Sequence, residues 1–310
     1  MLFLFLLIRE GAGQVGAAIA RAGWGLLAIM FYHLLQTLSD AAGWLVLIPK
    51  EHKIPLVKGF FLHWMGESIN NLLPTGRVGG DIVMTRIAAL WGIPLRTSTA
   101  AMIVDITIGI VTKVLYIVAA CILLIAVTGR TDLARPAVVA VITGTLAAAG
   151  FYSVQRLGMF RWSAILTSRL ARSSGWDSLD QGGEALDQAI GNVYAHRGGV
   201  AGCTFFWILS WLIASGEIWF TLWALGSPSS LVTAVILESA ALAIRGAAFL
   251  VPAAVGVQEG GLMLLGNLLG IPGEIALALS LIRRIRELAL GIPGLIAWQV
   301  IEANRLWRGR

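Results

Sequence analysis

The stretch L-P-T-G-R-V-G-G-D, from Leu73 to Asp81, decides the fold we expect, because the chain repeats it. Pro74 is followed 20 residues later by Gly92-Ile93-Pro94, and Pro252 is followed 20 residues later by Gly270-Ile271-Pro272. The copies lie 178 positions apart without a gap, and each contains a glycine-rich acidic patch, G-R-V-G-G-D at 76–81 and G-V-Q-E-G-G at 256–261. Internal repeats in an apolar chain are typical of transporter folds, which place their sites between the repeats.

The composition indicates a polytopic membrane protein. The 310 residues are 57% hydrophobic and 13% charged, with a mean hydropathy of +0.81, whereas soluble domains average about 25% charged residues. The apolar runs are too long for barrel strands, so we expect an all-α fold. The net charge of +6 is interpreted as cytoplasmic loops facing anionic lipid, and nucleic-acid binding is not expected.

Nine apolar segments are predicted, of two kinds. Two pairs are too short to cross a bilayer and meet at Pro/Gly-rich tips, which favours re-entrant hairpins. The full spans are Ala22 to Ile48, Thr97 to Val127, Ala134 to Val154, Val200 to Leu225 and Glu274 to Ile301; the short pairs are Val57 to Leu72 with Val78 to Trp91, and Leu231 to Leu250 with Gly256 to Leu269.

We expect one transmembrane domain over residues 1–310. It contains repeat 1 at about 50–128, an amphipathic cytoplasmic linker at about 155–198, and repeat 2 at about 229–301. Three full spans separate the hairpins, so the two copies should be inverted. The loops then carry 12 basic residues on one side and 4 on the other, which places the basic side and the C-terminus in the cytoplasm. Met1 to Ile8 is too short to span and is expected to be the trimmed end of a first helix.

Charged residues inside the apolar segments are the main functional signal. One unpaired charge at a helix centre costs about 2.5–3.5 kcal/mol on insertion scales, so these residues must pair or face water in a shared polar interior. The candidates are Asp40, Glu67, Arg77, Asp81, Arg86, Asp105, Lys113, Glu217, Glu238, Arg245, Glu259, Arg283, Arg284, Arg286 and Glu287.

The repeat register predicts specific pairs among these charges. Adding 178 maps Glu67 onto Arg245 and Asp105 onto Arg283, with inverted charge, and maps Asp81 onto Glu259. If a pseudo-two-fold axis passes between the hairpins, Glu67 should contact Arg245, and Asp105 should contact Arg283. Such pairs would either form alternating gates or only hold the bundle together. Proton coupling would fall to Glu67, Asp81, Glu238 and Glu259.

Polar residues at the first hairpin are candidates for binding a head group. Arg77 and Asp81 flank the start of a half-helix, whose free N–H groups favour an anion such as a lipid phosphate. Arg86 could add bidentate contacts. Asn70 and Asn71 either bind the head group or cap the preceding half-helix. We expect no metal site, no cofactor and no catalytic residue, because the four histidines and two cysteines show no ligand spacing and no triad pattern occurs.

Three motifs resemble those of the lysylphosphatidylglycerol synthase transmembrane-region family. They are G-E-S-I-N-N-L-L-P-T-G-R-V-G-G-D at 66–81, V-P-A-A-V-G-V-Q-E-G-G at 251–261 and S-L-I-R-R-I-R-E at 280–287. The sequence E-S-I-N-N-L-L-P at 67–74 is most similar to the hopanoid-associated HpnL branch. By this resemblance the site positions are Glu67, Asn70, Asn71, Pro74, Gly79, Gly80, Asp81, Pro252, Gly256, Glu259, Gly260, Arg283, Arg286 and Glu287.

The resemblance implies lipid translocation or transfer in a bacterial inner membrane, in the manner of a flippase. The lipid expected is a hopanoid or an anionic phospholipid, and partner proteins of lipid biosynthesis or export are expected; the oligomeric state is not specified by the sequence. The alternative is an intramembrane enzyme or a non-transporting subunit of a lipid-biosynthesis complex. We expect no enzyme activity, and in particular no attachment of lysine to a lipid, because the sequence shows no soluble aminoacyl-transferase domain. An ion channel is disfavoured by the alternating charge signs.

Overall fold

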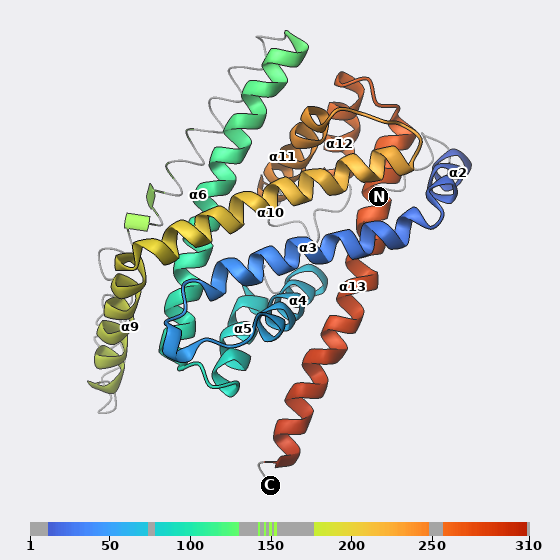
Figure 1. The fold of residues 1–310 in the computed structure, drawn as a ribbon. Helices are drawn as coiled ribbons and strands as arrows, with labels where there is room; N and C mark the ends of the chain where they lie inside the picture. Colours follow the sequence, from blue (N-terminus) through green and yellow to red (C-terminus); the bar gives the residue numbers. More distant parts are fainter. Residues whose placement is uncertain are drawn as a thin grey trace.

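The computed structural model describes residues 12–73, 78–129, 177–247 and 257–308, with a few single positions between 142 and 153. Within this part of the chain every regular element is a helix, which confirms the predicted all-α class (Figure 1). The elements are α2 (Ala12–Ala22), α3 (Gly25–Leu45), the 3₁₀ turn η1 (Lys50–His52), α4 (Leu56–Leu72), α5 (Gly79–Leu90), α6 (Leu95–Thr128), α9 (Asp177–Ala195), α10 (Arg197–Ala224), α11 (Leu231–Ala247), α12 (Val257–Leu268) and α13 (Gly273–Arg308).

Each Gly-Ile-Pro sequence forms the same helix stop and restart. Gly92 and Gly270 adopt positive φ angles of 102° and 77°, the left-handed conformation that favours glycine at a helix C-terminus. The N–H groups of the following isoleucines then bond back to the carbonyls of Ala88 and Gly266, at 3.1 and 2.8 Å. The prolines begin the next helix, since they have no N–H to lose there.

The bounds of one helix pair and the starts of the next pair repeat with the sequence offset of 178. Residues 79–90 of α5 map onto residues 257–268, which are the bounds of α12, and the first residue of α6 maps onto the first residue of α13. Two equivalent series follow, α3 to α6 and α10 to α13. The tips of both predicted hairpins, at 74–77 and 248–256, lie outside the described residues, as does most of the predicted span from Ala134 to Val154.

The two series interlock around a central helix pair. Helices α3 and α10 pack along each other and run in opposite directions. Helices α6 and α13 also run in opposite directions in the view of Figure 1. The α4–α5 pair packs against α13 through α4, whereas the α11–α12 pair packs against α6 through α11. Each short pair therefore packs against the last helix of the other series. Among the described residues, the helix pair α3–α10 occupies the centre between the two short pairs.

Two apolar cores leave a polar zone between them. One core includes Ile29 on α3 and is built mainly from α10 to α13, and the other includes Trp44 on α3 and is built mainly from α4 to α6. Along α3, the polar residues His33, Thr37 and Asp40 lie between these two core residues. The fold thus places polar side chains at the middle of the molecule.

Helices α6 and α10 are long and apolar enough to cross a membrane. Helices α3 and α13 form over the predicted extents but carry more polar residues. Part of the predicted amphipathic linker is helical, as α9, and α9 packs against the first residues of α6 and α10.

Candidate functional site

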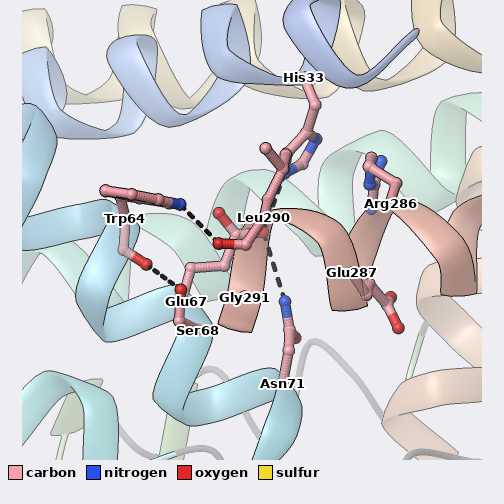
Figure 2. A pocket seen from close by; sticks show the side chains of 9 residues that line it. All are labelled: His33, Trp64, Glu67, Ser68, Asn71, Arg286, Glu287, Leu290 and Gly291. Atoms are coloured by element: carbon pink, nitrogen blue, oxygen red, sulfur yellow. Dashed lines mark hydrogen bonds and ion pairs between the residues drawn. The ribbon is translucent and has the colours of Figure 1, made fainter. Parts of the chain in front are cut away.

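A chain of polar contacts joins the two helix series at the centre of the molecule. The imidazole Nε2 of His33 lies 3.0 Å from Glu67 Oε1, and its Nδ1 lies 3.0 Å from Glu217 Oε2. The guanidinium of Arg286 pairs with the other oxygen of Glu217. The network therefore runs from α4 through α3 and α10 to α13. Figure 2 shows its His33, Glu67 and Arg286 side chains converging from three helices.

Glu67 is the most heavily bonded carboxylate of this network. Besides His33, it accepts hydrogen bonds from Thr37 Oγ1 at 3.3 Å and from Asn71 Nδ2 at 3.4 Å. Its side chain is 35% exposed, against 7% for His33 and 4% for Glu217. Glu67 is thus the end of the network that water can reach.

A cavity of about 250 Å³ opens beside Glu67, between α3, α4, α5, α6 and α10. Four carboxylates and one lysine line it together with polar and apolar side chains. The lining residues are Thr37, Asp40, His63, Glu67, Asn70, Asn71, Asp81, Met84, Met102, Asp105, Ile106, Gly109, Ile110, Lys113 and Trp207. We refer to this space as the acidic cavity.

Local contacts hold the carboxylates of the acidic cavity in place. Asp105 accepts hydrogen bonds from Trp207 Nε1 at 3.0 Å and from Cys203 Sγ at 3.3 Å. The side chain of Asn70 accepts from the backbone N–H of Gly80 at 2.8 Å and donates to Asp81 at 3.4 Å. Asn70 therefore links α4 to the first turn of α5, where the positive end of the helix dipole stabilises the carboxylate of Asp81.

A second, small cavity of about 10 Å³ lies on the α13 side of Glu67 (Figure 2). This volume is about that of a single water site. Glu67 and Asn71 line both cavities, whereas His33, Arg286 and Glu287 line only the small one. Glu67 and Asn71 thus form the partition between the two spaces.

The arginines of α13 pair with carboxylates on three different helices. Arg283 lies 2.8 Å from Glu238 on α11, and Arg284 lies 3.5 Å from Glu259 on α12 and 3.1 Å from Glu287. Glu287 also contacts Arg245 of α11 at 3.1 Å. Most charges of the second series are therefore neutralised within that series.

Both predicted charge pairs across the repeats are wrong. Glu67 contacts His33, Thr37 and Asn71 rather than Arg245. Asp105 contacts Cys203 and Trp207, because α6 packs there on α10, and Arg283 turns to Glu238 instead. The offset of 178 relates α5 to α12 and the start of α6 to the start of α13, but each charge faces a helix that packs closer than its sequence equivalent.

The structure gathers the predicted site residues into two groups. Glu67, Asn70, Asn71, Asp81 and Asp105 line the acidic cavity. Those that form ion pairs on α13 are Glu238, Arg245, Glu259, Arg283, Arg286 and Glu287.

Two predicted residues fall outside these groups. Arg86 pairs with Glu302 and is 53% exposed, so it is away from the site. Arg77 lies outside the described residues.

His33 was not predicted, although its place inside an apolar span was a usable signal. Among the described residues no group of three or more histidine, cysteine, aspartate or glutamate side chains could hold a metal ion.

The fold and this polar interior define an α-helical membrane protein with a charged site between two helix series. The chain belongs to the family described as lysylphosphatidylglycerol synthase TM region, which matches residues 1–294. Its function is therefore related to membrane lipids. The chain matches none of the curated proteins or solved structures with which it was compared.

Proposed function

We propose that this protein moves a membrane lipid between the two leaflets without changing it chemically. The observation that carries the proposal is the acidic cavity of about 250 Å³, enclosed by apolar helices of a lipid-related membrane protein. A polar head group could occupy this cavity while the apolar tail stays in the bilayer. The faces of α5 and α6 suit the tail, since Ile82, Leu115 and Ile122 are exposed there.

Polar atoms in the interior that lack hydrogen-bond partners support a route for a lipid head group rather than a purely structural set of ion pairs. Arg283 and Arg286 are buried, yet Nε of both and one terminal nitrogen of Arg283 have no hydrogen-bond partner among the residues that the structure describes. Buried donors without partners are costly and rare in packed interiors. Water or a passing head group would satisfy them.

The charge of the acidic cavity favours a hydroxylated lipid over an anionic one. Four carboxylates, those of Asp40, Glu67, Asp81 and Asp105, face one ammonium group, that of Lys113. A phosphate would be repelled, whereas hydroxyl groups would donate hydrogen bonds to the carboxylates. Of the two lipid classes expected, we favour a hopanoid, in line with the resemblance to the HpnL branch.

We further propose that the two helix series are inverted repeats in a bacterial inner membrane, with the C-terminus in the cytoplasm. The opposite directions of α3 and α10, and of α6 and α13, support the inversion. Single cysteines placed after Pro94 and after Pro272 should react with a membrane-impermeant reagent from opposite sides of the membrane. Labelling of both from one side would contradict the inversion.

The test of lipid movement uses the full chain reconstituted in vesicles. A fluorescent hopanoid and a fluorescent phosphatidylglycerol are compared by quenching the outer leaflet with dithionite. We expect faster exchange of the hopanoid probe, loss of that exchange in Asp105→Asn, and no change in Glu51→Gln, which alters an exposed carboxylate on η1.

Mass spectrometry of the same vesicles separates transport from the alternative function. Unchanged lipid masses together with altered leaflet distribution support translocation. A new lipid mass would instead identify an intramembrane enzyme. No change in either mass or distribution would favour a non-transporting subunit.

A further inference from the structure

His33 holds two carboxylates at once. Both imidazole nitrogens lie 3.0 Å from a carboxylate oxygen, one of Glu67 and one of Glu217. A neutral imidazole donates through only one nitrogen, and an ionised carboxylate only accepts. Two hydrogen bonds therefore require two protons among these three groups, which we call the bridging trio. Removal of one proton must break one of the two bonds.

The charges around the bridging trio balance only when both protons are present. With Glu67, Glu217, His33 and Arg286 all ionised, the formal charges of −1, −1, +1 and +1 sum to zero. Loss of a proton leaves one uncompensated negative charge in a buried site, which is strongly unfavourable.

Other charged groups surround the trio without joining it. They are Asp40 on α3, His63 on α4, Asp81 on α5, Asp105 and Lys113 on α6, and Arg283, Arg286 and Glu287 on α13, of which Arg286 pairs with Glu217. None of these gives the imidazole a third hydrogen bond.

The bridging trio joins the two helix series. His33 and Glu67 belong to α3 and α4, whereas Glu217 belongs to α10. The bond from His33 to Glu217 therefore crosses from one series to the other. Loss of the proton that this bond uses therefore breaks a contact between the two halves of the molecule.

Glu67 is the most exposed member of the trio. Glu67 is 35% exposed and lines both the acidic cavity and the small cavity, whereas His33 and Glu217 are almost fully buried. A carboxylate on the partition between two cavities can take a proton from one space and release it into the other.

We propose that lipid movement by this protein is coupled to protons, with His33, Glu67 and Glu217 as the proton-binding site. The inference rests on the proposed function, because it concerns what drives the same movement. Protonation closes the contact between the halves, and release of the proton opens it.

The test uses the full chain in vesicles of phosphatidylethanolamine and phosphatidylglycerol that contain a trace of fluorescent hopanoid and a trapped pH dye. A pH gradient is imposed in one direction and then in the other, with the membrane potential clamped. We expect the probe to accumulate in one leaflet, and to accumulate in the opposite leaflet when the gradient is reversed. We also expect the dye to report proton flow only when the probe is present.

Variants separate the proton site from the lipid path. His33→Gln keeps one hydrogen-bond donor but cannot carry the charge, so whatever exchange of the probe it retains should not respond to the gradient. His52→Gln, which removes an imidazole on η1 away from the site, should respond like the wild type. If His33→Gln does not fold, the response of the wild type to the reversed gradient decides by itself whether lipid movement is coupled to protons.

The outcomes distinguish the two proposals. Exchange that ignores the pH gradient in the wild type would overturn proton coupling and leave lipid translocation standing. Absence of exchange under every gradient would overturn the proposed function itself. A gradient response that persists in a folded His33→Gln would exclude His33 from the proton site.

Discussion

At the scale of single residues, the arginines of α13 show how a charged helix is stabilised inside an apolar bundle. Successive residues of a helix point about 100° apart, so Arg283, Arg284 and Arg286 face different neighbours. Each finds a carboxylate on a different helix, namely Glu238 on α11, Glu259 on α12 and Glu217 on α10. These ion pairs therefore fix the rotation of α13 within the bundle.

Replacement of Arg286 by methionine should destabilise the protein strongly. The change leaves the carboxylate of Glu217 buried with one cationic partner fewer, and loss of one member of a buried pair costs about 3–5 kcal/mol. Arg86→Met is the matched control, because the pair of Arg86 with Glu302 is half exposed and such pairs contribute about 0–1 kcal/mol. Equal unfolding midpoints for the two variants in detergent would contradict this prediction.

The sequence identified the charged residues but not their partners. Charge inside an apolar segment is visible from composition, so Glu67 and Arg283 could be found. Their partners depend on helix rotation and on which helices pack closest, and neither property follows from the 178-residue offset. His33 illustrates the gap, since its importance arises only when Glu67 and Glu217 meet it from two other helices.

At the scale of helices, the boundaries follow from local chemistry and were largely predictable. Prolines and left-handed glycines act on the residues next to them, so the ends of α5 and α12 could be placed from sequence within about two residues. The crossing of α4 and α5 depends on glycines in a different way. A Cβ at Gly80 would collide with the carbonyl group of Gly66.

Gly80→Ala should therefore push α4 and α5 apart and disturb the acidic cavity. Overpacking of a close contact costs about 1–3 kcal/mol, and the backbone of Gly66 cannot move aside as a side chain would. Gly13→Ala on α2 is the control, because its Cβ would have no neighbour within 4 Å, and alanine in a helix is favoured over glycine by about 0.8–1.0 kcal/mol. The unfolding midpoints of the two variants should shift in opposite directions.

Gly92→Ala and Gly270→Ala should destabilise the protein by similar amounts. Both positions need positive φ angles, which cost an L-residue about 1–2 kcal/mol, and both have open space around the added methyl group. The strain of the turn is thus the only expected effect. A large difference between the two variants would show that the repeated turns are not equivalent in energy.

At the scale of the whole molecule, the two helix series exchange packing partners, and this exchange would transmit any movement of one series to the other. Helix α4 packs on α13 and α11 packs on α6, while α3 and α10 pack on each other. A rocking of one series against the other would change all of these contacts together, in the manner of repeat-built transporters. The helix bounds could be read from sequence, but this exchange depends on contacts between distant segments and could not.

A disulfide between α4 and α13 should stop lipid movement by locking the two series together. A Cβ at Gly294 would lie 2.9 Å from the Cβ of Ser68, and disulfides need a Cβ separation of about 3.5–4.5 Å, so a small shift allows the bond. The double variant Ser68→Cys with Gly294→Cys should exchange the fluorescent lipid when reduced and fall to the rate of protein-free vesicles when oxidised. The single variants, which retain the natural Cys121 and Cys203, should not respond to oxidant. Full exchange in the crosslinked protein would mean that lipid passes without relative motion of α4 and α13.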